Sequence, residues 1–385
     1  MFNFGFIVEQ ALGHVTHYQN LKYWVDKDNN IKPNWMPVGA STNDIWEKLP
    51  VIRNNWSLQV SLRARKAIKT AIKSQKPDAL FLHTQTLALF SIPFMRRIPT
   101  IISTDATPFN LDSIAAGYNH KVGDNYFAEY AKYQWNKSTY NAAAAIVTWC
   151  EWAKDSLVDD YGISADKVLV IPPGVDLEKW NFSLNSNNKS IEYTPKNPLR
   201  LLFVGGDFAR KGGYTLLEAF LNSLDGDFRL DIVTRDTSLK RELSGIENIG
   251  LYCDLTPNSE RLKQLYAQAD IFVFPTQADC LPSAISEAMA AGLPVITTNI
   301  GALCEQVEHQ VNGLIVPPSD ATALAIALQT LKDNPEKIAA MAAASRRIAE
   351  KRFDAQRNYG AILNLMKSIS HKPRLQYKAE NLFHV

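Results

Sequence analysis

Residues 270–296, DIFVFPTQADCLPSAISEAMAAGLPVI, place a helix-length segment between two short apolar runs. The runs IFVF and LPVI are bounded by polar or chain-breaking residues, which is typical of strands buried on both faces of a sheet. Pro282 suits the first position of a helix, where the N–H that proline lacks has no partner to lose. A strand, a turn, a helix and a second strand in this order predict a parallel sheet covered by helices.

The same alternation covers most of the chain and forms two series. The first series of candidate strands comprises NFGFIV near the start, DALFLHT at 78–84, PTIISTDA at 99–106, AAIVTWC at 144–150 and KVLVIPPGVD at 167–176. The second comprises LRLLFVGG, FRLDIVT, NIGLYCD, DIFVFPT, LPVITTN and NGLIVPP, between residues 199 and 318. Helical patterns lie between most neighbouring strands, so the sequence predicts an α/β fold with two Rossmann-like, doubly wound domains.

A polar stretch marks the predicted boundary between the domains. Residues 181–198, NFSLNSNNKSIEYTPKNP, contain Asn, Ser and Pro but little periodic apolar content, so we predict a linker here. The N-terminal domain then covers 1–180 and the C-terminal domain 199–355, and a last helix at about 356–370 can pack back on the first domain. Ligands of doubly wound sheets bind at the carboxyl ends of the strands, so we expect the site in a cleft between the domains.

The bulk composition excludes several classes of protein. A net charge of +2, with 46% hydrophobic and 21% charged residues, gives no reason to expect nucleic-acid binding. The four cysteines lie far apart and, like the histidines, show no metal-ligand spacing, which predicts reduced thiols and no metal. The N-terminus lacks the basic segment of a signal peptide, and no run of about eighteen apolar residues occurs. We therefore expect a cytoplasmic protein without a membrane span.

The segment GGDFARKGG, residues 205–213, ends the first strand of the second series with glycines and two cations. Gly205 and Gly206 let the backbone approach a ligand closely, and Arg210 and Lys211 add positive charge next to a helix start, which suits a phosphate. The segment matches neither a Walker loop nor GxGxxG. A glycine turn with two solvated basic side chains explains the same residues, and the pattern alone does not decide.

Two acids, Asp279 and Glu287, lie eight residues apart around the predicted helix start. The N–H groups of Ser283 and Ala284 have no intrahelical partner and lie at the positive end of the helix dipole, which suits an anion. Glu287, one turn into the helix, can accept hydrogen bonds from sugar hydroxyls, while Asp279 reaches further out from the turn. The alternative is a pair of surface acids around a helix cap.

Taken together, these segments resemble the donor-site signature of the family-four glycosyltransferases, in which two acids flank seven residues. The resemblance continues through FVGGDFARKGGYTLLEAF, NGLIVPPSDATALAIAL and WCEWAKDSLVDDYGISADKVLVIPPGVD. It is close over about residues 145–330 and looser in the N-terminal half. It implies the GT-B fold, with two Rossmann-like domains facing an interdomain cleft, the nucleotide-sugar in the C-terminal domain and the acceptor in the N-terminal one. It also implies transfer with retention of configuration and without a metal, by front-face displacement in which the departing phosphate helps to deprotonate the acceptor.

The resemblance assigns roles at the donor site. Glu287 matches the acid that binds the ribose hydroxyls, and Asp279 matches the acid that contacts the transferred sugar. Arg210 and Lys211 match the diphosphate site, where positive charge stabilises the departing nucleotide. These two cations and Asp279 form the expected catalytic set. The other expected donor-binding residues are Gly13 in the N-terminal glycine loop, Gly205, Gly206, Tyr252 and Cys253 beside the base, and Leu281, Pro282, Ser283 and Ala284 at the helix start.

Three positions depart from the family's pattern. The first acid is Asp279 rather than Glu, so its reach is one methylene shorter, which is compatible with an altered sugar preference or weak activity. Gly206 stands where many relatives carry Arg, so we expect Arg210 to supply the missing charge. Thr104 stands where many relatives carry His. The acceptor side therefore has several candidates, with Asp105 ranked first and Thr104, His14, His83 and His120 beside it.

The sequence thus predicts a metal-independent, retaining hexosyltransferase without a cofactor. Its expected donor is a nucleoside diphosphate sugar, UDP-glucose first, and its expected acceptor is a hydroxyl of a polysaccharide, oligosaccharide or lipid-linked sugar. A nucleotide-sugar epimerase of the same fold and a binding protein without turnover are the alternatives. A basic helix at 61–76 leaves two interpretations, a solvated face or weak peripheral contact with the inner face of a membrane or with an anionic acceptor. Its basic residues are Arg63, Arg65, Lys66, Lys69, Lys73 and Lys76.

Overall fold

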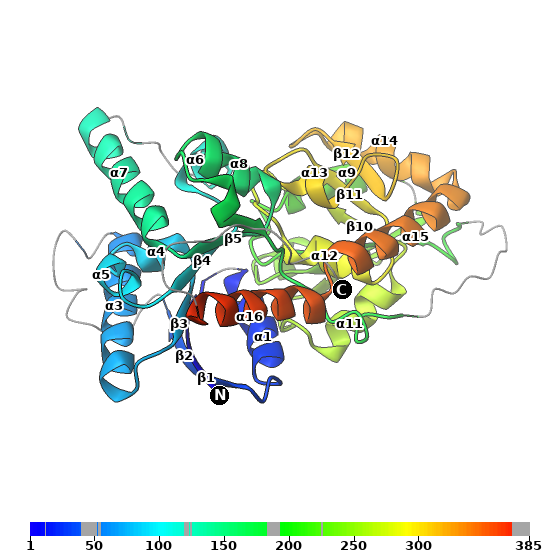
Figure 1. Cartoon of the computed structure of the whole chain (residues 1–385). Helices are drawn as coiled ribbons and strands as arrows, with labels where there is room; N and C mark the ends of the chain where they lie inside the picture. Colours follow the sequence, from blue (N-terminus) through cyan, green and yellow to red (C-terminus); the bar gives the residue numbers. More distant parts are fainter. Residues whose placement is uncertain are drawn as a thin grey trace. The chain divides into compact units, whose positions relative to one another are not determined.

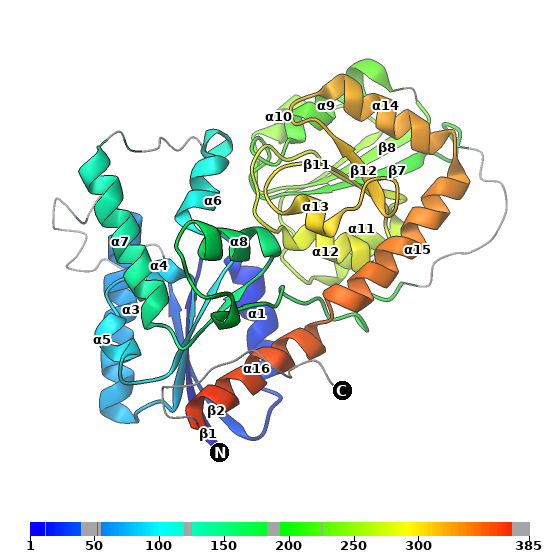
Figure 2. The same ribbon diagram turned by 45° about the horizontal axis from the view of Figure 1, so that its top comes forward.

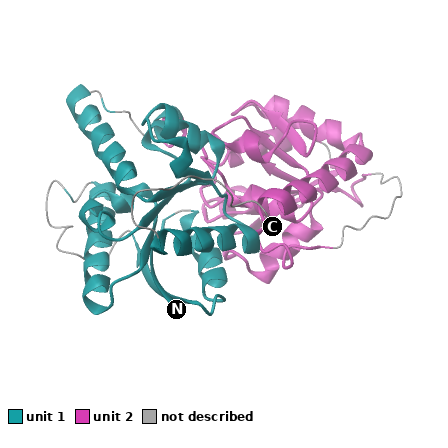
Figure 3. Ribbon diagram, in the orientation of Figure 1, with its two compact units in different colours: residues 1–113, 121–174, 355–385 teal, residues 114–120, 175–354 magenta. Residues whose placement is uncertain are grey.

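A computed structural model describes residues 1–11, 13–39, 52, 55–118, 123, 125–182, 193–224 and 226–371. The chain divides into two compact units, coloured separately in Figure 3. Unit 1 comprises residues 1–113, 121–174 and 355–385, and unit 2 comprises 114–120 and 175–354. The chain therefore passes from unit 1 to unit 2 after Gly174 and returns after Asp354. Of the predicted linker, residues 181, 182 and 193–198 group with unit 2, and the remainder lies outside the described residues.

Within its described residues, unit 1 contains a six-stranded sheet in the order β2-β1-β3-β4-β5-β6, with every pair parallel. Its strands are β1 (Phe2–Glu9), β2 (Ile31–Val38), β3 (Ala79–His83), β4 (Thr100–Thr104), β5 (Ala145–Thr148) and β6 (Val168–Val170). Its helices are α1 (His14–Val25), α3 (Trp56–Ser74), α4 (Gln85–Ala88), α5 (Ile92–Met95), α6 (Pro108–Ser113), α7 (Tyr126–Ala142), α8 (Glu151–Asp159), the 3₁₀ helix η3 (Ala165–Lys167) and α16 (Ala355–His371).

Both faces of this sheet are buried, as Figure 2 shows from the helices on its two sides. On β1, Phe4 and Phe6 belong to one core cluster and Ile7 to the other, because successive side chains of a strand point to opposite faces. The first cluster is completed by α1 and α16, which lie side by side in Figure 1. The last helix therefore packs on the sheet of unit 1 although it follows unit 2 in the chain.

Unit 2 contains a second six-stranded parallel sheet among its described residues, in the order β12-β11-β10-β7-β8-β9. Its strands are β7 (Leu199–Val204), β8 (Phe228–Val233), β9 (Ile249–Tyr252), β10 (Ile271–Phe274), β11 (Val295–Thr298) and β12 (Gly313–Val316). Its helices are the 3₁₀ helix η2 (Ala115–Tyr118), α9 (Gly213–Ser223), α10 (Leu239–Glu242), α11 (Glu260–Gln268), α12 (Ser283–Ala290), α13 (Leu303–Gln306), α14 (Ala321–Lys332) and α15 (Pro335–Arg352). The predicted α/β fold with two doubly wound parallel sheets is confirmed.

The strand orders define where each sheet can bind a ligand. In a doubly wound sheet, the helices diverge to opposite faces at the point where the strand order reverses, and this opens a crevice at the carboxyl ends of the strands. That point lies between β1 and β3 in unit 1 and between β7 and β10 in unit 2. The residues that follow these four strands are therefore the first candidates for a functional site.

Candidate functional site

The loops after β7 and β10 in unit 2 are joined by hydrogen bonds. The carbonyl of Arg210 accepts from the backbone N–H of Gln277 at 2.9 Å and from the hydroxyl of Thr276 at 3.2 Å. Gly212 permits this approach, because its φ is +79° and an added Cβ would lie 1.8 Å from the carbonyl oxygen of Pro275. The hydroxyl of Thr298 donates to the carbonyl of Thr276 at 2.7 Å and fixes the end of β10 from β11. The two predicted motifs are therefore joined at one edge of the sheet.

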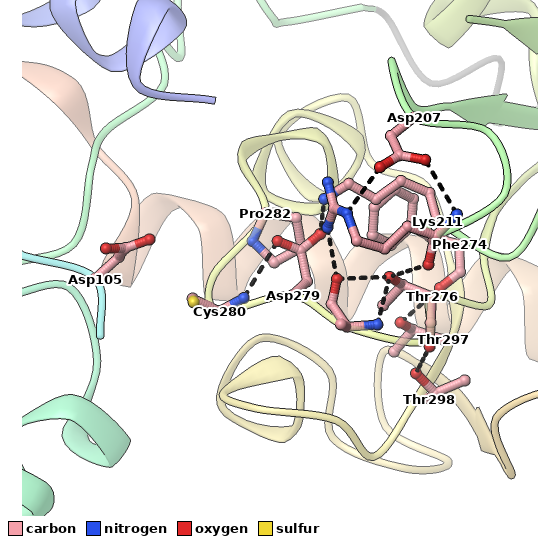
Figure 4. A network of polar contacts seen from close by, with 12 residues as sticks. Asp105, Asp207, Lys211, Phe274, Thr276, Asp279, Cys280, Pro282, Thr297 and Thr298 are labelled. Carbon is pink, nitrogen blue, oxygen red and sulfur yellow. Dashed lines mark hydrogen bonds and ion pairs between the residues drawn. The ribbon is translucent and has the colours of Figure 1, made fainter. Parts of the chain in front are cut away.

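Lys211 and Asp279 are brought together at this edge, where Lys211 Nζ donates to Asp279 Oδ2 (Figure 4). The two side chains are only 14% and 12% exposed, so the ion pair is largely removed from water. Burial lowers the pKa of the Lys211 amine, and the Asp279 carboxylate opposes that shift. The other carboxylate oxygen, Asp279 Oδ1, accepts from the backbone N–H of Cys280 at 3.2 Å. This pair combines a buried cation and a buried anion next to a helix start.

Arg210 is oriented by contacts of its own. Its Nε donates to Asp207 at 3.0 Å, one guanidinium nitrogen donates to the carbonyl of Ala278 at 2.7 Å, and the guanidinium lies 4.6 Å above the ring of Tyr118. Tyr118 belongs to η2, the segment of the first half of the chain that groups with unit 2. Two of the five N–H donors of the Arg210 side chain are therefore used inside the protein.

Helix α12 begins at Ser283, and Pro282 is its N-cap rather than its first residue. The prediction for Pro282 was therefore wrong by one position, because its backbone is extended. The N–H groups of Ser283 and Ala284 precede the first intrahelical bond and have no partner within the helix. Gln306 of α13 fixes this end of the helix, since its Nε2 donates to the carbonyl of Pro282 at 3.2 Å and to the Ser286 hydroxyl at 2.8 Å. Leu281 is buried directly before the cap.

Glu287 lies one turn into α12 and is 7% exposed. Its carboxylate accepts a hydrogen bond from the hydroxyl of Tyr266 at 3.2 Å. Burial raises the pKa of Glu287 to about 7, although the hydrogen bond from Tyr266 acts in the opposite direction. The interpretation of Asp279 and Glu287 as two exposed surface acids is therefore wrong, because both carboxylates are buried.

The neighbouring strands β8 and β9 contribute further residues to the same edge. Gly205 faces Lys211, whose Cβ would lie 3.1 Å from a Cβ added at position 205. Gly206 faces the side chain of Arg235, which follows β8. At the end of β9, the Tyr252 hydroxyl donates to Asp231 at 3.4 Å, and Cys253 Sγ lies 3.6 Å from the carbonyl of Asp236. The predicted positions of unit 2 thus lie after β7, β9 and β10.

Unit 1 has a second polar cluster, at the carboxyl ends of β1 and β4. His14 lies between two carboxylates, with Nδ1 3.5 Å from Glu9 and Nε2 3.7 Å from Asp105. Glu9 is 6% exposed and accepts from the indole of Trp56 at 3.0 Å and from the hydroxyl of Thr84 at 3.1 Å. Burial would lower the pKa of His14, but the two carboxylates, Asp105 first, outweigh it and raise the pKa to about 10. The cluster therefore holds one imidazolium and two carboxylates.

Two further histidines lie against His14. Its ring centroid is 4.7 Å from that of His83, which in turn is 4.7 Å from His17 and stacks on Trp149. Burial, with the charge of His14, lowers the pKa of His17 to about 3. Burial likewise holds the pKa of His83 well below its usual range, so both rings are neutral beside the charged one. Nε2 of each of these two neutral rings is buried without a hydrogen-bond partner among the described residues.

The remaining acceptor candidates have different surroundings. Thr104 is fully buried, and its hydroxyl is within hydrogen-bonding distance of Gln85 Oε1 at 2.8 Å and the Ala106 carbonyl at 2.6 Å. A Cβ added at Gly13 would meet no atom within 4 Å, so the chain itself leaves space at this turn. His120 lies outside the described residues. The structure therefore brings His14, His83 and Asp105 together and gives the hydroxyl of Thr104 a structural partner.

Sequence reasoning missed Glu9, Arg235 and Tyr118. Glu9 is the last residue of β1, and Arg235 follows β8. Both lie at carboxyl ends of strands, where ligands of doubly wound sheets bind, so the reasoning that selected Asp279 could also have found them. Tyr118 carries no such signal, because its contact with Arg210 joins segments from different halves of the chain.

The basic side chains of the helix predicted at 61–76 have two kinds of surroundings. On α3, Arg63 is buried and donates to the carbonyl of Gly39 at 2.9 Å, while Arg65 donates to the carbonyl of Phe90. Lys66, Lys69, Lys73 and Lys76 are exposed.

Among the residues that the structure describes, no group of three acidic, histidine or cysteine side chains is arranged to hold a metal. Nor does any described helix combine the length and apolar character needed to cross a membrane.

Two family models match adjacent parts of the chain. The model described as Glycosyltransferase Family 4 matches residues 38–179, and the one described as Glycosyl transferases group 1 matches residues 198–334. The first lies mainly in unit 1, and the second lies in unit 2 and includes Lys211, Asp279 and Glu287.

Curated relatives match about half of the chain. The amylovoran biosynthesis glycosyltransferase AmsK of Erwinia amylovora is 29% identical over 222 residues, which are 54% of this chain and 53% of the relative. A D-inositol 3-phosphate glycosyltransferase of Saccharomonospora viridis is 27% identical over 237 residues, which are 55% and 53% of the two chains. The chain thus spans about half the length of the curated relatives it matches.

Solved structures resemble the whole chain. Sucrose-phosphate synthase from Thermosynechococcus elongatus has a TM-score of 0.74 and 16% identity, covering 96% of this chain and 99% of that one. Anabaena HepE, solved in complex with UDP and glucose, has a TM-score of 0.69 and 16% identity, covering 96% and 100%. At these identities the likeness is one of fold, and it agrees with the two parallel sheets described above.

Proposed function

Because this chain belongs to the group 1, family-four glycosyltransferases and has their GT-B fold, we propose that it transfers a hexose from a nucleoside diphosphate sugar to a hydroxyl of a carbohydrate acceptor. The observation that carries this proposal is the buried pair of Lys211 and Asp279 next to the start of α12, with Glu287 one turn further on. The same edge of the sheet thus offers three kinds of group. Lys211 and the backbone N–H groups at the start of α12 attract anions, while Asp279 and Glu287 are two carboxylates that can accept hydrogen bonds.

Each kind of group suits one part of the donor. The diphosphate binds Lys211 and the N–H groups of Ser283 and Ala284, since a helix start and a lysine both attract anions. Glu287 accepts hydrogen bonds from the ribose hydroxyls. Asp279 accepts hydrogen bonds from the sugar that is transferred. When the diphosphate enters, it competes with Asp279 for the charge of Lys211, and the carboxylate becomes available to the sugar.

The acceptor contacts Asp105 in unit 1. Asp105 lies beside the His14 ring, and its carboxylate oxygens can accept a hydrogen bond from a sugar hydroxyl. In the transfer, the bond between the anomeric carbon and the diphosphate oxygen breaks on the face where the acceptor oxygen attacks. The hydroxyl proton passes to the departing phosphate, so atoms and charge balance and configuration is retained. Neither a metal nor a cofactor takes part in this scheme.

The identity of the donor is part of the proposal. UDP-glucose is our first choice, and it is consistent with the nucleotide and sugar found in the HepE complex, a protein of the same fold. The acceptor is a polysaccharide, oligosaccharide or lipid-linked sugar. The relatives' names refer to amylovoran biosynthesis and D-inositol 3-phosphate, so the acceptor of this chain has to be found by screening.

The proposal is tested by incubating the full chain with UDP-glucose, with and without a panel of carbohydrate acceptors, and following the sugar by proton NMR. We expect nucleotide release together with a product, or a hydrolysed sugar, that keeps the α configuration. An isomerised nucleotide-sugar formed without acceptor would identify an epimerase instead. Tight nucleotide binding without turnover of any donor in the panel would identify a binding protein. Asp279→Asn is the control for turnover that does not depend on this site.

A further inference from the structure

The positive charges at the edge of the unit 2 sheet are not equally available. Lys211 forms an ion pair with Asp279, and Arg210 is hydrogen-bonded to Asp207 and to the carbonyl of Ala278. Arg235 is exposed and forms no hydrogen bond or ion pair with any residue that the structure describes. Arg235 is therefore a cation at this edge whose guanidinium is not already used by the protein.

The position of Arg235 is fixed by the sheet. β8 pairs with β7 in parallel, with Val233 opposite Val204, and the N–H of Gly205 donates to the carbonyl of Val233 at 2.9 Å. Arg235 follows two residues after Val233, so it leaves the sheet beside the glycines that end β7. A Cβ added at Gly206 would lie 3.6 Å from Cδ and 3.7 Å from Nε of Arg235. The arginine side chain thus runs along the space in front of Gly206.

The neighbouring acid, Asp236, forms no ion pair with this arginine among the described residues. The Asp236 carboxylate accepts from the backbone N–H of Ser238 at 3.0 Å and from its hydroxyl at 2.6 Å, in the turn that leads into α10. The guanidinium of Arg235 keeps its five donors, and this planar group matches two phosphate oxygens at once. At Gly206, beside this side chain, an added Cβ would make only ordinary contacts.

We infer that Arg235 binds the diphosphate of the donor, supplying from the end of β8 the positive charge that position 206 lacks. This inference rests on the proposed function, because it needs a nucleoside diphosphate at this edge. It differs from the expectation that Arg210 supplies the charge, and Arg210 already donates to Asp207 and to the carbonyl of Ala278. Arg235 then acts together with Lys211, one guanidinium and one ammonium on the same anion.

The experiment is a calorimetric titration of the full chain with UDP and, separately, with uridine. Arg235→Ala should weaken UDP binding about 10- to 100-fold, as expected for lost hydrogen bonds to a charged group. Uridine binding should be unchanged, because the nucleoside has no phosphate. Arg235→Gln should behave like Arg235→Ala and excludes an effect of lost side-chain volume. Arg241→Ala is the matched control, since it removes an exposed cation from α10 and should leave both affinities unchanged.

A second variant tests the location of the charge. Gly206 does not have a positive φ and its added Cβ has only ordinary contacts, so an arginine fits there. Gly206→Arg in the Arg235→Ala background should restore UDP binding. Equal affinities of wild type and Arg235→Ala for UDP would overturn the inference, and so would equal losses for UDP and uridine. Failure of wild type to bind UDP, GDP and ADP would instead contradict the proposed function, so the two failures can be told apart.

Discussion

Lys211 and Asp279 are 68 residues apart in sequence and form a buried ion pair at the point where the strand order of unit 2 reverses. A buried pair is sensitive to the loss of one partner, because the remaining charge is left in a poorly solvating environment. In the proposed function, the diphosphate competes with Asp279 for the charge of Lys211. The same contact is therefore expected to matter for stability and for donor binding.

The first prediction concerns this pair. Asp279→Asn should lower the free energy of unfolding by about 3 kcal/mol, because Lys211 is left buried without a counter-charge. It should also lower transfer at least 100-fold, roughly the loss that follows removal of one charge-stabilising group. Asp207→Asn is the control, since Asp207 itself is half-exposed in its ion pair with Arg210 and its substitution should cost less than about 1 kcal/mol. Thermal unfolding measures the stabilities, and the rate of sugar transfer from the donor measures the second effect. Equal stabilities of the two variants would contradict the prediction.

The second prediction concerns the pH dependence of nucleotide binding. Burial raises the pKa of Glu287 to about 7, so the free protein carries a partly protonated carboxyl near neutral pH. Because the ionised carboxylate accepts ribose hydrogen bonds better, nucleotide affinity should rise as the pH passes upward through about 7. The stability contributed by this group has the opposite sign. The stability contributed by Glu287 is fully present below its pKa in the unfolded chain, which is near 4.5, and is lost as the pH rises through about 7. Between these two pKa values the folded protein holds a proton that the unfolded chain has released, so raising the pH favours unfolding.

Glu287→Gln provides the comparison for this measurement. Phosphate groups of the nucleotide also titrate, and that contribution is the same for both proteins. Calorimetric titrations across the pH range should therefore show a steeper rise in affinity for wild type than for Glu287→Gln. Parallel pH profiles for the two proteins would exclude ionisation of Glu287 as part of binding.

The third prediction concerns His14. Its pKa of about 10 means that the imidazolium persists well above the ordinary value of 6.5. The stability that this charge contributes is fully present below the unfolded value and is lost as the pH rises through about 10. NMR of the His14 ring protons should show no titration near neutral pH. In Glu9→Gln, which removes one of the two carboxylates, the titration should move to lower pH. A wild-type His14 that titrates near 6.5 would be incompatible with the cluster described.

The fourth prediction separates steric clash from backbone strain. Gly212→Ala combines a φ of +79° with a Cβ 1.8 Å from the Pro275 carbonyl. Gly245→Ala has a similar φ of +86° but meets nothing within 4 Å. Gly245→Ala should cost about 1–2 kcal/mol, the usual penalty for a left-handed L-residue. Gly212→Ala should cost clearly more and weaken nucleotide binding, because the loop that carries Lys211 must move. Urea unfolding of both variants checks this, and equal losses would rule out the clash.

The fold could be predicted where strands form continuous buried runs. All six strands of unit 2 fall within the predicted segments, and β7, β8, β10 and β11 are the ones with mostly or wholly buried residues. β2 was not predicted, because IKPNWMPV contains two prolines. It forms the edge of the sheet and pairs only with β1. Pro33 and Pro37 are four residues apart, so their nitrogens face the same side, and an edge strand has one side without ladder hydrogen bonds.

The site could be predicted where a motif carries its own signal. Lys211, Asp279 and Glu287 lie in two such motifs, although the burial of both acids and the pairing of Asp279 with Lys211 depend on how the loops pack. Arg235 follows a strand and could have been found on that ground, but its place beside Gly206 depends on the pairing of β7 with β8. The contact of Tyr118 with Arg210 depends in the same way on a segment that joins unit 2 from the first half of the chain.

The most direct test of the central claim is the affinity of the full chain for UDP, GDP and ADP, measured by calorimetric titration of wild type and Glu287→Ala. We predict that one of the three binds to wild type and that Glu287→Ala weakens its binding at least 10-fold, as expected for lost hydrogen bonds to a buried charged group. No binding by any of the three, or equal binding by wild type and Glu287→Ala, would contradict the assignment of this edge of the sheet as a nucleotide-sugar site.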